Sequence, residues 1–195
     1  MGLFRSLGGP AEARLDGKRV YLRPPNENDW RCFAKVRSES RAFLEPWEPT
    51  WPADALTRSA YRNRLRRYGS DWRAGRAYSF FLFEYDGERL LGGISIANVR
   101  RGVAQTGALG YWIGSKYARQ GYMGEALFLL LGFCFTDLRI HRVEAACLLH
   151  NEASQRLLTN AGFRHEGVAH KYLKINGQWQ DHNLYAMLAG DFAQD

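Results

Sequence analysis

Hydrophobic and polar positions alternate along this chain in short segments that predict strands at both of its ends. The segment 19–23 alternates and stops at two prolines, which favours a first strand. Two turns, Asp86-Gly87 and Asn176-Gly177, carry residues that favour tight hairpins between strands. The predicted strands are 19–23, 77–85, 89–99, 106–114, 141–149, 163–175 and 178–188.

Helical segments separate these strands. Asn26 or Asn28 can cap a first helix that continues to about Ser40. Three prolines in 43–52 exclude a regular helix there. The further predicted helices are 53–73, an apolar one over 121–135, and a short one over 151–162. The order β-α-α-β-β-β-α-β-α-β-β predicts an α+β fold and differs from the regular alternation of a doubly wound dinucleotide-binding domain.

Length and composition are typical of a globular protein. The 195 residues suit one domain, and we expect a flexible lead over 1–17 followed by a single domain over 18–195. No apolar run reaches the ~18 residues of a membrane span, so we expect no membrane partner. The three cysteines are odd in number and lack metal-ligand spacing. This usage predicts reduced thiols, a cytoplasmic location and no bound metal.

The net charge of +7 favours an anionic ligand or partner. Much of it comes from arginines in and just after the predicted helix 53–73: Arg62, Arg64, Arg66, Arg67, Arg73 and Arg76. Such a run is commonly only a solvated helix face. The alternatives are contact with a phosphate-bearing cofactor or with RNA, although no nucleic-acid motif supports sequence-specific readout.

The feature most indicative of function is a strand that turns through a glycine-bearing loop into a helix. The predicted strand 106–114 leads into Arg119-Gln-Gly-Tyr-Met-Gly124. Unpaired backbone N–H groups and the positive end of the helix dipole make such a helix start a site for phosphates. The loop lacks the Lys-Ser/Thr of a P-loop, which argues against nucleotide triphosphate hydrolysis. A second polar feature, Asn151 to Phe163, follows after one helix and one strand.

Together, these two features and the order of elements resemble the GNAT family of N-acetyltransferases. The resemblance covers about Lys18 to Leu188 and is closest to the ribosomal-protein N-terminal acetyltransferases of the RimJ and RimL type. It implies a GNAT-like central mixed, mostly antiparallel sheet of about seven strands flanked by helices. The stretches that carry it are 44–49, 150–154, 161–163, 166–167 and 172–182, of which the last favours the alanine-directed RimJ type.

The resemblance implies acetyl-CoA as co-substrate and two groups of residues that bind it. The first group is the end of the strand before the loop: Trp112, Ile113 and Gly114. The second is the loop, whose amides would hold the pyrophosphate: Arg119, Gln120, Gly121, Tyr122, Met123 and Gly124. Ala118 and Met123 depart from the family's usual residues, so we expect the pyrophosphate to be bound mainly by backbone amides. Asn151 would lie beside the pantetheine arm, although Asn is also a preferred helix N-cap.

Acetyl transfer needs a neutral amine, a polarised thioester carbonyl and a proton for the departing thiolate. An α-amine has a pKa near ~7.7–8.0, so a mild base or a water relay is enough. Glu48 is the first candidate base and could also attract the substrate's ammonium group; its alternative is an ordinary exposed loop carboxylate. Glu125 is weaker, because a carboxylate in the first turn of a helix already favours the dipole.

Ser154 matches a position that, in RimL-type relatives, is proposed to protonate the thiolate. Its hydroxyl could relay a hydrogen bond, or bond locally to the helix backbone. The sequence around Cys134 and Cys147 does not suggest a lowered thiol pKa, so we expect direct transfer in a ternary complex.

The leading hypothesis is therefore acetylation of a protein N-terminus, with alanine on a ribosomal protein as the acceptor. A small-molecule acetyltransferase acting on polyamines or antibiotics is one alternative. A CoA-binding, ribosome-associated assembly or regulatory factor, with the arginines of 62–76 on RNA, is another. Both a monomer and a homodimer remain open.

Overall fold

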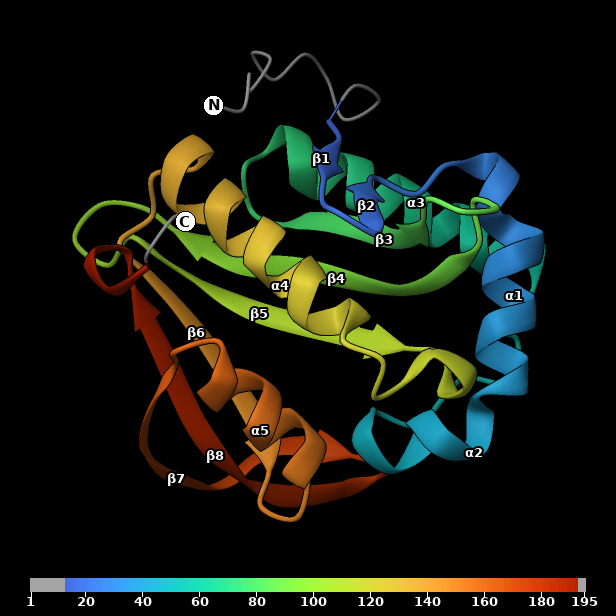
Figure 1. Ribbon diagram of the computed structural model, residues 1–195. Coiled ribbons are helices and arrows are strands. Elements are labelled where there is room, and N and C mark those ends of the chain that lie inside the picture. Colours follow the sequence, from blue (N-terminus) through green and yellow to red (C-terminus); the bar gives the residue numbers. More distant parts are fainter. Residues whose placement is uncertain (1–12, 193–195) are drawn as a thin grey trace.

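A mixed eight-stranded sheet forms the centre of the computed structural model, which describes residues 13–192 (Figure 1). Its strand order is β1-β2-β3-β4-β5-β6-β8-β7, and only the β5–β6 pair is parallel. The strands are β1 (Leu15–Asp16), β2 (Val20–Arg23), β3 (Tyr78–Glu84), β4 (Leu90–Arg100), β5 (Thr106–Ile113), β6 (Arg142–Leu148), β7 (Arg164–Ile175) and β8 (Gln178–Leu188).

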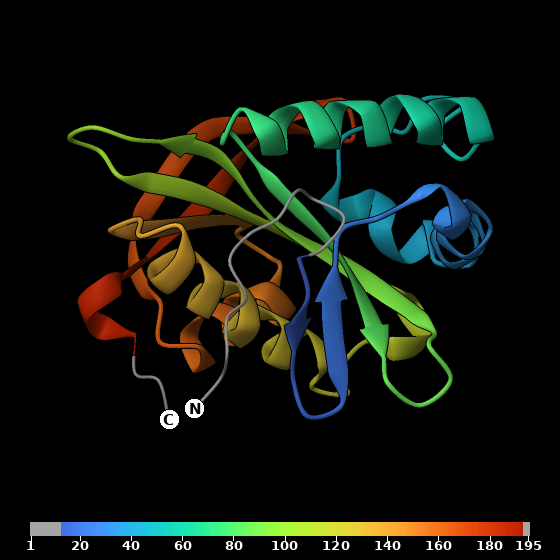
Figure 2. The same ribbon diagram turned by 90° about the horizontal axis from the view of Figure 1, so that it is seen from above.

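Helices cover both faces of this sheet. Figure 2 shows α1 and α3 on one side and α4 and α5 on the other. None of the helices in residues 13–192 is both long enough and apolar enough to span a bilayer. The α-helices are α1 (Trp30–Glu39), α2 (Arg41–Leu44), α3 (Arg58–Arg73), α4 (Tyr122–Gly132) and α5 (Glu152–Asn160). Shorter segments are η1 (Glu27–Asp29), η2 (Glu45–Trp47), η3 (Ser115–Tyr117), the π-helical η4 (Phe133–Asp137) and η5 (Ala189–Asp191).

The predicted α+β fold is confirmed, and so are both predicted hairpins. Asn176 and Gly177 have φ values of 43° and 81°, and Gly87 has 91°. These left-handed conformations are what a tight hairpin turn requires, and Asn and Gly adopt them at low cost.

Three details differ from the prediction. The lead ends earlier than predicted, because Leu15 and Asp16 pair with β2 and Leu15 is buried; residues 1–12 lie outside the described part. The helix predicted from residue 53 begins at Arg58, where the Thr57 hydroxyl accepts a hydrogen bond from the Ala60 N–H at 3.2 Å. The proline-rich segment 43–52, predicted to hold no regular helix, includes the last two residues of the short α2, and then only the single 3-10 turn η2.

Alternation along β3 divides the core between the two faces. Phe81 and Phe83 pack with Phe33 of α1 and Tyr61 of α3. On the other face, residues of β3 pack against the apolar side of α4, which includes Leu127 and Leu130. Burying each such side chain contributes about 1.5–3 kcal/mol, so the sheet is held firmly between its helices.

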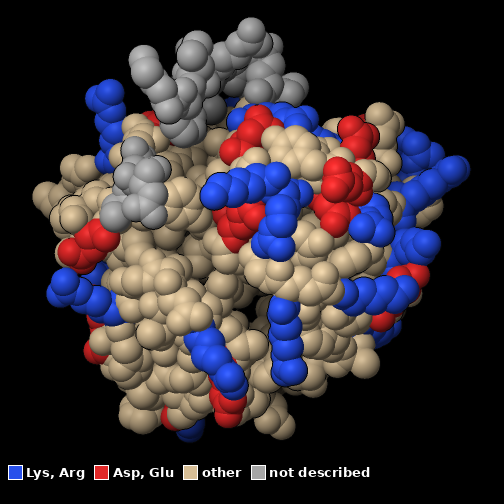
Figure 3. All heavy atoms as spheres, in the orientation of Figure 1, with Lys and Arg blue, Asp and Glu red and all other residues tan. Residues whose placement is uncertain are grey.

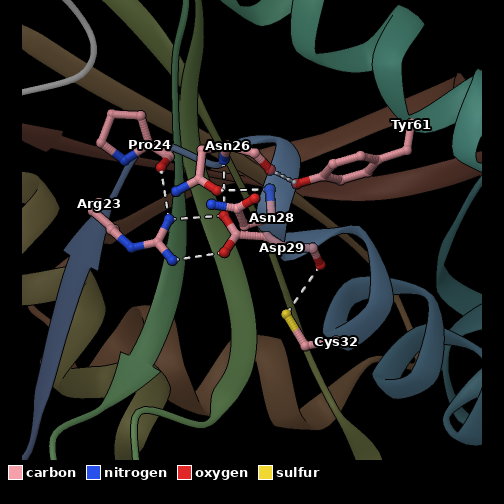
Figure 4. A network of polar contacts seen from close by, with 7 residues as sticks. All are labelled: Arg23, Pro24, Asn26, Asn28, Asp29, Cys32 and Tyr61. Carbon is pink, nitrogen blue, oxygen red and sulfur yellow. Dashed lines mark hydrogen bonds and ion pairs between the residues drawn. The ribbon is translucent and has the colours of Figure 1, made fainter.

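A polar network fixes the start of α1 against α3 (Figure 4). Arg23 donates from Nη1 and Nη2 to the two carboxylate oxygens of Asp29, at 2.7 and 2.6 Å. The Tyr61 hydroxyl donates to the Asn26 carbonyl oxygen at 2.8 Å. Burial raises the pKa of Tyr61, so this hydroxyl stays protonated and keeps its donor role.

Candidate functional site

The two parallel strands at the centre of the sheet separate along their length. β5 and β6 pair only at Thr106–Arg142, Gly107–Val143 and Ala108–Glu144. Beyond Ala108, β5 continues beside β4, and β6 continues beside β8. One backbone edge of β5, including Trp112 and Ile113, is therefore left without a neighbouring strand in the described structure. An extended amide-bearing ligand can pair with such an edge.

The separated ends of β5 and β6 open toward the start of α4. Figure 3 shows a hollow between this start and α5, lined by uncharged surface with Lys and Arg side chains beside it. Gly114 follows β5 and is buried, with its N–H bonded to the Leu91 carbonyl oxygen at 2.8 Å. A Cβ at Gly114 would lie 2.8 Å from Val36, so this close approach requires glycine.

The loop before α4 presents a row of unpaired donors. Within residues 13–192, the backbone N–H groups of Arg119, Gln120, Gly121, Tyr122, Met123 and Gly124 donate to no other group of the protein. Gly121 is the N-cap of α4, with φ +83°, and Arg119 also has a left-handed φ of +61°. The loop is therefore shaped for an anion that collects several N–H groups at a helix start.

The side chains of this loop are mostly committed to the protein itself. Gln120 donates to the Lys116 carbonyl oxygen at 2.7 Å, and the Tyr122 hydroxyl donates to Glu84 at 2.8 Å. Met123 is buried in the core under α4, whereas Arg119 is exposed. An anion at this loop would therefore meet backbone amides first.

Glu125 has a structural role. Its Oε1 accepts hydrogen bonds from the backbone N–H groups of Lys18 and Arg19 at 2.6 and 2.8 Å, and Oε2 accepts one from the Arg19 guanidinium at 3.2 Å. Burial by itself raises the pKa of Glu125, but these hydrogen bonds together lower it below its usual range. A carboxylate held this way ties the first strands to α4 and is a poor proton acceptor.

Asn151 and Ser154 lie at the start of α5, on the other side of the opening. Asn151 caps the helix, because its Oδ1 accepts a hydrogen bond from the Ser154 N–H at 3.1 Å. The cap uses only the amide oxygen, which leaves the Nδ2 donors for another partner.

Tyr111 of β5 lies near Ser154 of α5 and was not among the residues predicted from sequence. Burial raises the pKa of Tyr111 to about 12, and the nearby Ser154 side chain opposes this shift. Tyr111 therefore keeps its proton at neutral pH. The two residues come from elements far apart in the sequence, β5 and α5, so no local pattern could have indicated the pair.

The Glu48 carboxylate is surrounded by donors. Arg37 donates from Nη1 and Nη2 to its two oxygens, at 2.7 and 2.6 Å, and Trp51 Nε1 donates at 2.7 Å. The Arg37 guanidinium carbon lies 4.1 Å from the ring centroid of Trp51 and 4.9 Å from that of Trp112. Arg37, also unforeseen, therefore joins the proline-rich segment to the exposed edge of β5.

A cavity of about 320 Å³ lies beside this segment. It is lined by the end of β6 and the β7–β8 hairpin: Leu148, Leu149, His150, Lys171, Trp179, Gln180 and Asp181. The Trp47 and His150 rings pack in a tilted arrangement with their centroids 5.4 Å apart, and the Asn176 N–H donates to the Glu48 carbonyl oxygen at 3.0 Å. The proline-rich segment and the hairpin thus meet beside the cavity.

The cysteines are poor nucleophiles in this structure. Burial raises the pKa of Cys147 to about 11 and also raises those of Cys32 and Cys134. Thiolates are therefore scarce at neutral pH, which agrees with transfer that does not use a cysteine intermediate.

Comparisons with known proteins all find N-acetyltransferases. Residues 19–164 match the family model described as an acetyltransferase (GNAT) domain. The chain is 36% identical over 191 residues to the [ribosomal protein uS5]-alanine N-acetyltransferase of Escherichia coli, covering 97% of this chain and 98% of that protein. It is 35% identical over 180 residues to a Bacillus subtilis protein described as a probable N-acetyltransferase, covering 92% and 99%.

A solved structure of similar shape contains a CoA-type ligand. Mycobacterium smegmatis RimJ, in complex with CoA-disulfide, superposes with a TM-score of 0.89 at 30% identity, covering 96% of this chain and 93% of that one. A CoA-type ligand thus occurs in a relative that shares nearly the whole fold.

Proposed function

This chain belongs to the GNAT acetyltransferase family, and from that premise we propose that it moves the acetyl group of acetyl-CoA to a protein N-terminus. The acceptor we propose is an N-terminal alanine of a ribosomal protein. The observation that carries the proposal is the opening between β5 and β6, which ends at six unpaired amides, three in the loop before α4 and three in its first turn. One edge suits the amide-bearing arm of CoA, and the amides suit its pyrophosphate.

In this arrangement, the loop from Arg119 to Gly124 holds the pyrophosphate through backbone N–H groups. The arm of the cofactor pairs with Trp112, Ile113 and Gly114, and the Nδ2 of Asn151 donates to it from the opposite side. The thioester then lies between β5 and α5, close to Tyr111 and Ser154. A helix start and a strand edge are both rigid, so the acetyl group is presented in one orientation.

The chemical step is a direct attack of the acceptor amine on the thioester carbonyl carbon. A C–N bond forms, the C–S bond breaks, and the thiolate takes a proton from the Tyr111 hydroxyl, which lies near Ser154. The attacking species is the neutral fraction of the α-amine, which grows as the pH approaches its pKa near ~7.7–8.0. After the attack the nitrogen gives its extra proton to water, and water returns one proton to Tyr111, so the products are the N-acetylated chain and the CoA thiol.

We propose that Glu48 attracts and orients the acceptor and does not remove its proton. Its two oxygens already accept three hydrogen bonds, from Arg37 and Trp51. Protonation would break part of that network. The negative charge nevertheless stands in the segment next to the cavity, where it favours the approach of an ammonium group.

An alanine-directed acceptor site is supported by the uS5-alanine acetyltransferase relative, which aligns over nearly the whole chain. The cavity at the end of β6 supplies a place for the first residues of a polypeptide, between Trp179 of the hairpin and His150, which packs against Trp47.

Release of CoA tests this proposal. The protein is incubated with acetyl-CoA and peptides that differ only in their first residue, with spermidine as a small-amine control. We expect the fastest release with alanine and a product acetylated on the α-amine. Transfer to spermidine alone would overturn the acceptor assignment, and no transfer to any amine would overturn the activity.

A further inference from the structure

The outer face of α3 carries a dense positive charge that the acetyltransfer site does not use. The helix contains six arginines and a single acidic residue, Asp71, in 16 residues. Its inner face buries Tyr61, and Arg64 packs over the ring of Phe33 at 5.2 Å. The arginines that point away from the sheet are exposed: Arg58, Arg62, Arg66, Arg67 and Arg73.

Helix geometry aligns four of these arginines. Arg58, Arg62, Arg66 and Arg73 are separated by four, four and seven residues, which returns each of them to the same side of the helix. At about 1.5 Å per residue, the row is about 22 Å long. We call these four residues the arginine row. The other exposed residues on this side, such as Ser59 and Ser70, are small and polar.

The charge of the row is hardly neutralised inside the protein. The Asp71 carboxylate forms an ion pair with Arg76, with Oδ1 and Nη2 2.8 Å apart. Arg62 lies 3.8 Å from Glu27, and both side chains are more than half exposed, so this pair is weak. Across residues 13–192, Arg58, Arg66 and Arg73 form no ion pair; Arg66 donates only to the neighbouring Asn63.

The position of α3 separates this charge from the cofactor. Figure 2 shows α3 on the opposite side of the sheet from α4, whose start carries the anion-binding loop. The phosphates of CoA therefore do not account for the row. A membrane surface is disfavoured as well, because an interfacial helix needs an apolar face to insert, and the apolar face of α3 is already packed on the sheet.

We propose that the arginine row docks on the sugar–phosphate backbone of RNA. Arginine donates in a planar fork that matches phosphate oxygens, and serine hydroxyls also bond to phosphates. Contacts of this kind position a protein without reading sequence, which agrees with the lack of a base-reading motif. The choice of RNA rests on the proposed function, since a ribosomal-protein acceptor is encountered close to RNA.

Salt dependence of binding measures the number of phosphate contacts. The full-length protein is titrated onto a fluorescent 30-nucleotide RNA hairpin at about 50–200 mM KCl, and log Kd is plotted against log [KCl]. Replacing Arg62, Arg66 and Arg73 together by Gln should lower the slope by about two to three units. Binding at about 100 mM salt should weaken at least tenfold.

A matched variant removes three exposed arginines elsewhere: Arg139, Arg156 and Arg164, each replaced by Gln. It loses the same net charge and should keep a slope within about half a unit of the unmodified protein. Equal losses in both variants, or an unchanged slope in the α3 variant, would overturn the proposal. Displacement of the RNA by an equal charge concentration of poly-glutamate would overturn it in favour of an acidic protein partner.

Acetylation of a short alanine peptide separates this proposal from the proposed function. The α3 variant should keep kcat/KM for that peptide within about twofold, because α3 lies outside the transfer site. RNA binding through the arginine row without any acetyl transfer would contradict the proposed function and leave the docking proposal intact. Acetyl transfer without RNA binding would contradict only the docking proposal.

Discussion

Single side chains at this site differ in how many of their hydrogen-bonding atoms are already occupied by neighbouring residues. The Glu48 oxygens already accept hydrogen bonds from Arg37 and Trp51, whereas the Tyr111 hydroxyl keeps its proton because burial raises its pKa to about 12. This contrast could not be predicted from sequence. Glu48 was recognised as a carboxylate in the right loop, but its partner Arg37 is eleven residues earlier on α1 and carries no motif.

Replacing Glu48 by Gln should separate attraction from proton removal. The change weakens two charge-assisted bonds to a buried guanidinium, so the free energy of unfolding should fall by about 2 kcal/mol. The peptide KM should rise while kcat changes little, and the KM effect should shrink at high salt. Urea titration and steady-state kinetics measure both. Glu45→Gln, on an exposed neighbour paired with Arg41, serves as the control.

A large fall in kcat for Glu48→Gln, together with loss of the alkaline rise in rate, would instead identify Glu48 as the base. That result would contradict the electrostatic role. Equal effects of Glu48→Gln and Glu45→Gln would contradict any specific role for Glu48.

Replacing Tyr111 by Phe should reduce kcat by up to about 100-fold, because the thiolate then leaves without a positioned proton. Affinity for CoA, measured by calorimetry, should stay close to that of the unmodified protein. Tyr68→Phe on α3 is the control and should have no effect. An unchanged kcat in Tyr111→Phe would show that the thiolate leaves without help from this residue.

The pH profile of the unmodified protein should follow from the same groups. The rate rises as the acceptor amine loses its proton near ~7.7–8.0. It then stays level, since burial holds the pKa of Tyr111 at about 12 and its hydroxyl remains a donor below that pH. A fall in kcat between pH 8 and about 10, in a range where the fold is intact, would mean that another acid supplies the proton.

At the scale of elements, the loop before α4 shows which part of the site the sequence could predict. A glycine-bearing turn into an apolar helix indicated an anion site, and the structure places the unpaired amides there. The proximity of Tyr111 to Ser154 depends on how β5 and α5 are placed in the folded chain, which local sequence patterns do not encode. The strand β1 was missed because two residues carry no periodicity.

Gly121→Ala tests the backbone amide cradle. A side chain at φ +83° costs about 1–2 kcal/mol, and its Cβ would lie 3.1 Å from Arg19 Nη2. The loop should shift, and CoA binding should weaken about tenfold, which corresponds to 1.4 kcal/mol. Gly132→Ala in the same helix meets nothing within 4 Å; it should add about 0.5–1 kcal/mol of stability and leave CoA binding unchanged.

Calorimetric titration with CoA and thermal unfolding follow both glycine variants. A Gly121→Ala protein that loses stability but binds CoA like the unmodified protein would contradict the cradle. Loss of CoA binding in Gly132→Ala would show that the assay responds to general damage to α4.

At the scale of the whole molecule, the sheet separates two surfaces that could meet anions. The unpaired amides at the start of α4 lie on one side, and the arginine row of α3 lies on the other. The net charge of +7 suggested an anionic partner but could not divide the charge between two faces. That division needs the packing of Tyr61 and Phe33, which determines the outward side of α3.

The most direct test of the central claim is mass spectrometry of ribosomal proteins from the natural host, with and without this protein. The account predicts that one ribosomal protein starting with alanine loses its N-terminal acetyl group in the cells that lack this chain. Adding back the protein should restore that group, and adding back Tyr111→Phe should restore it poorly. Identical N-terminal acetylation in the two strains, across all ribosomal proteins detected, would contradict the account.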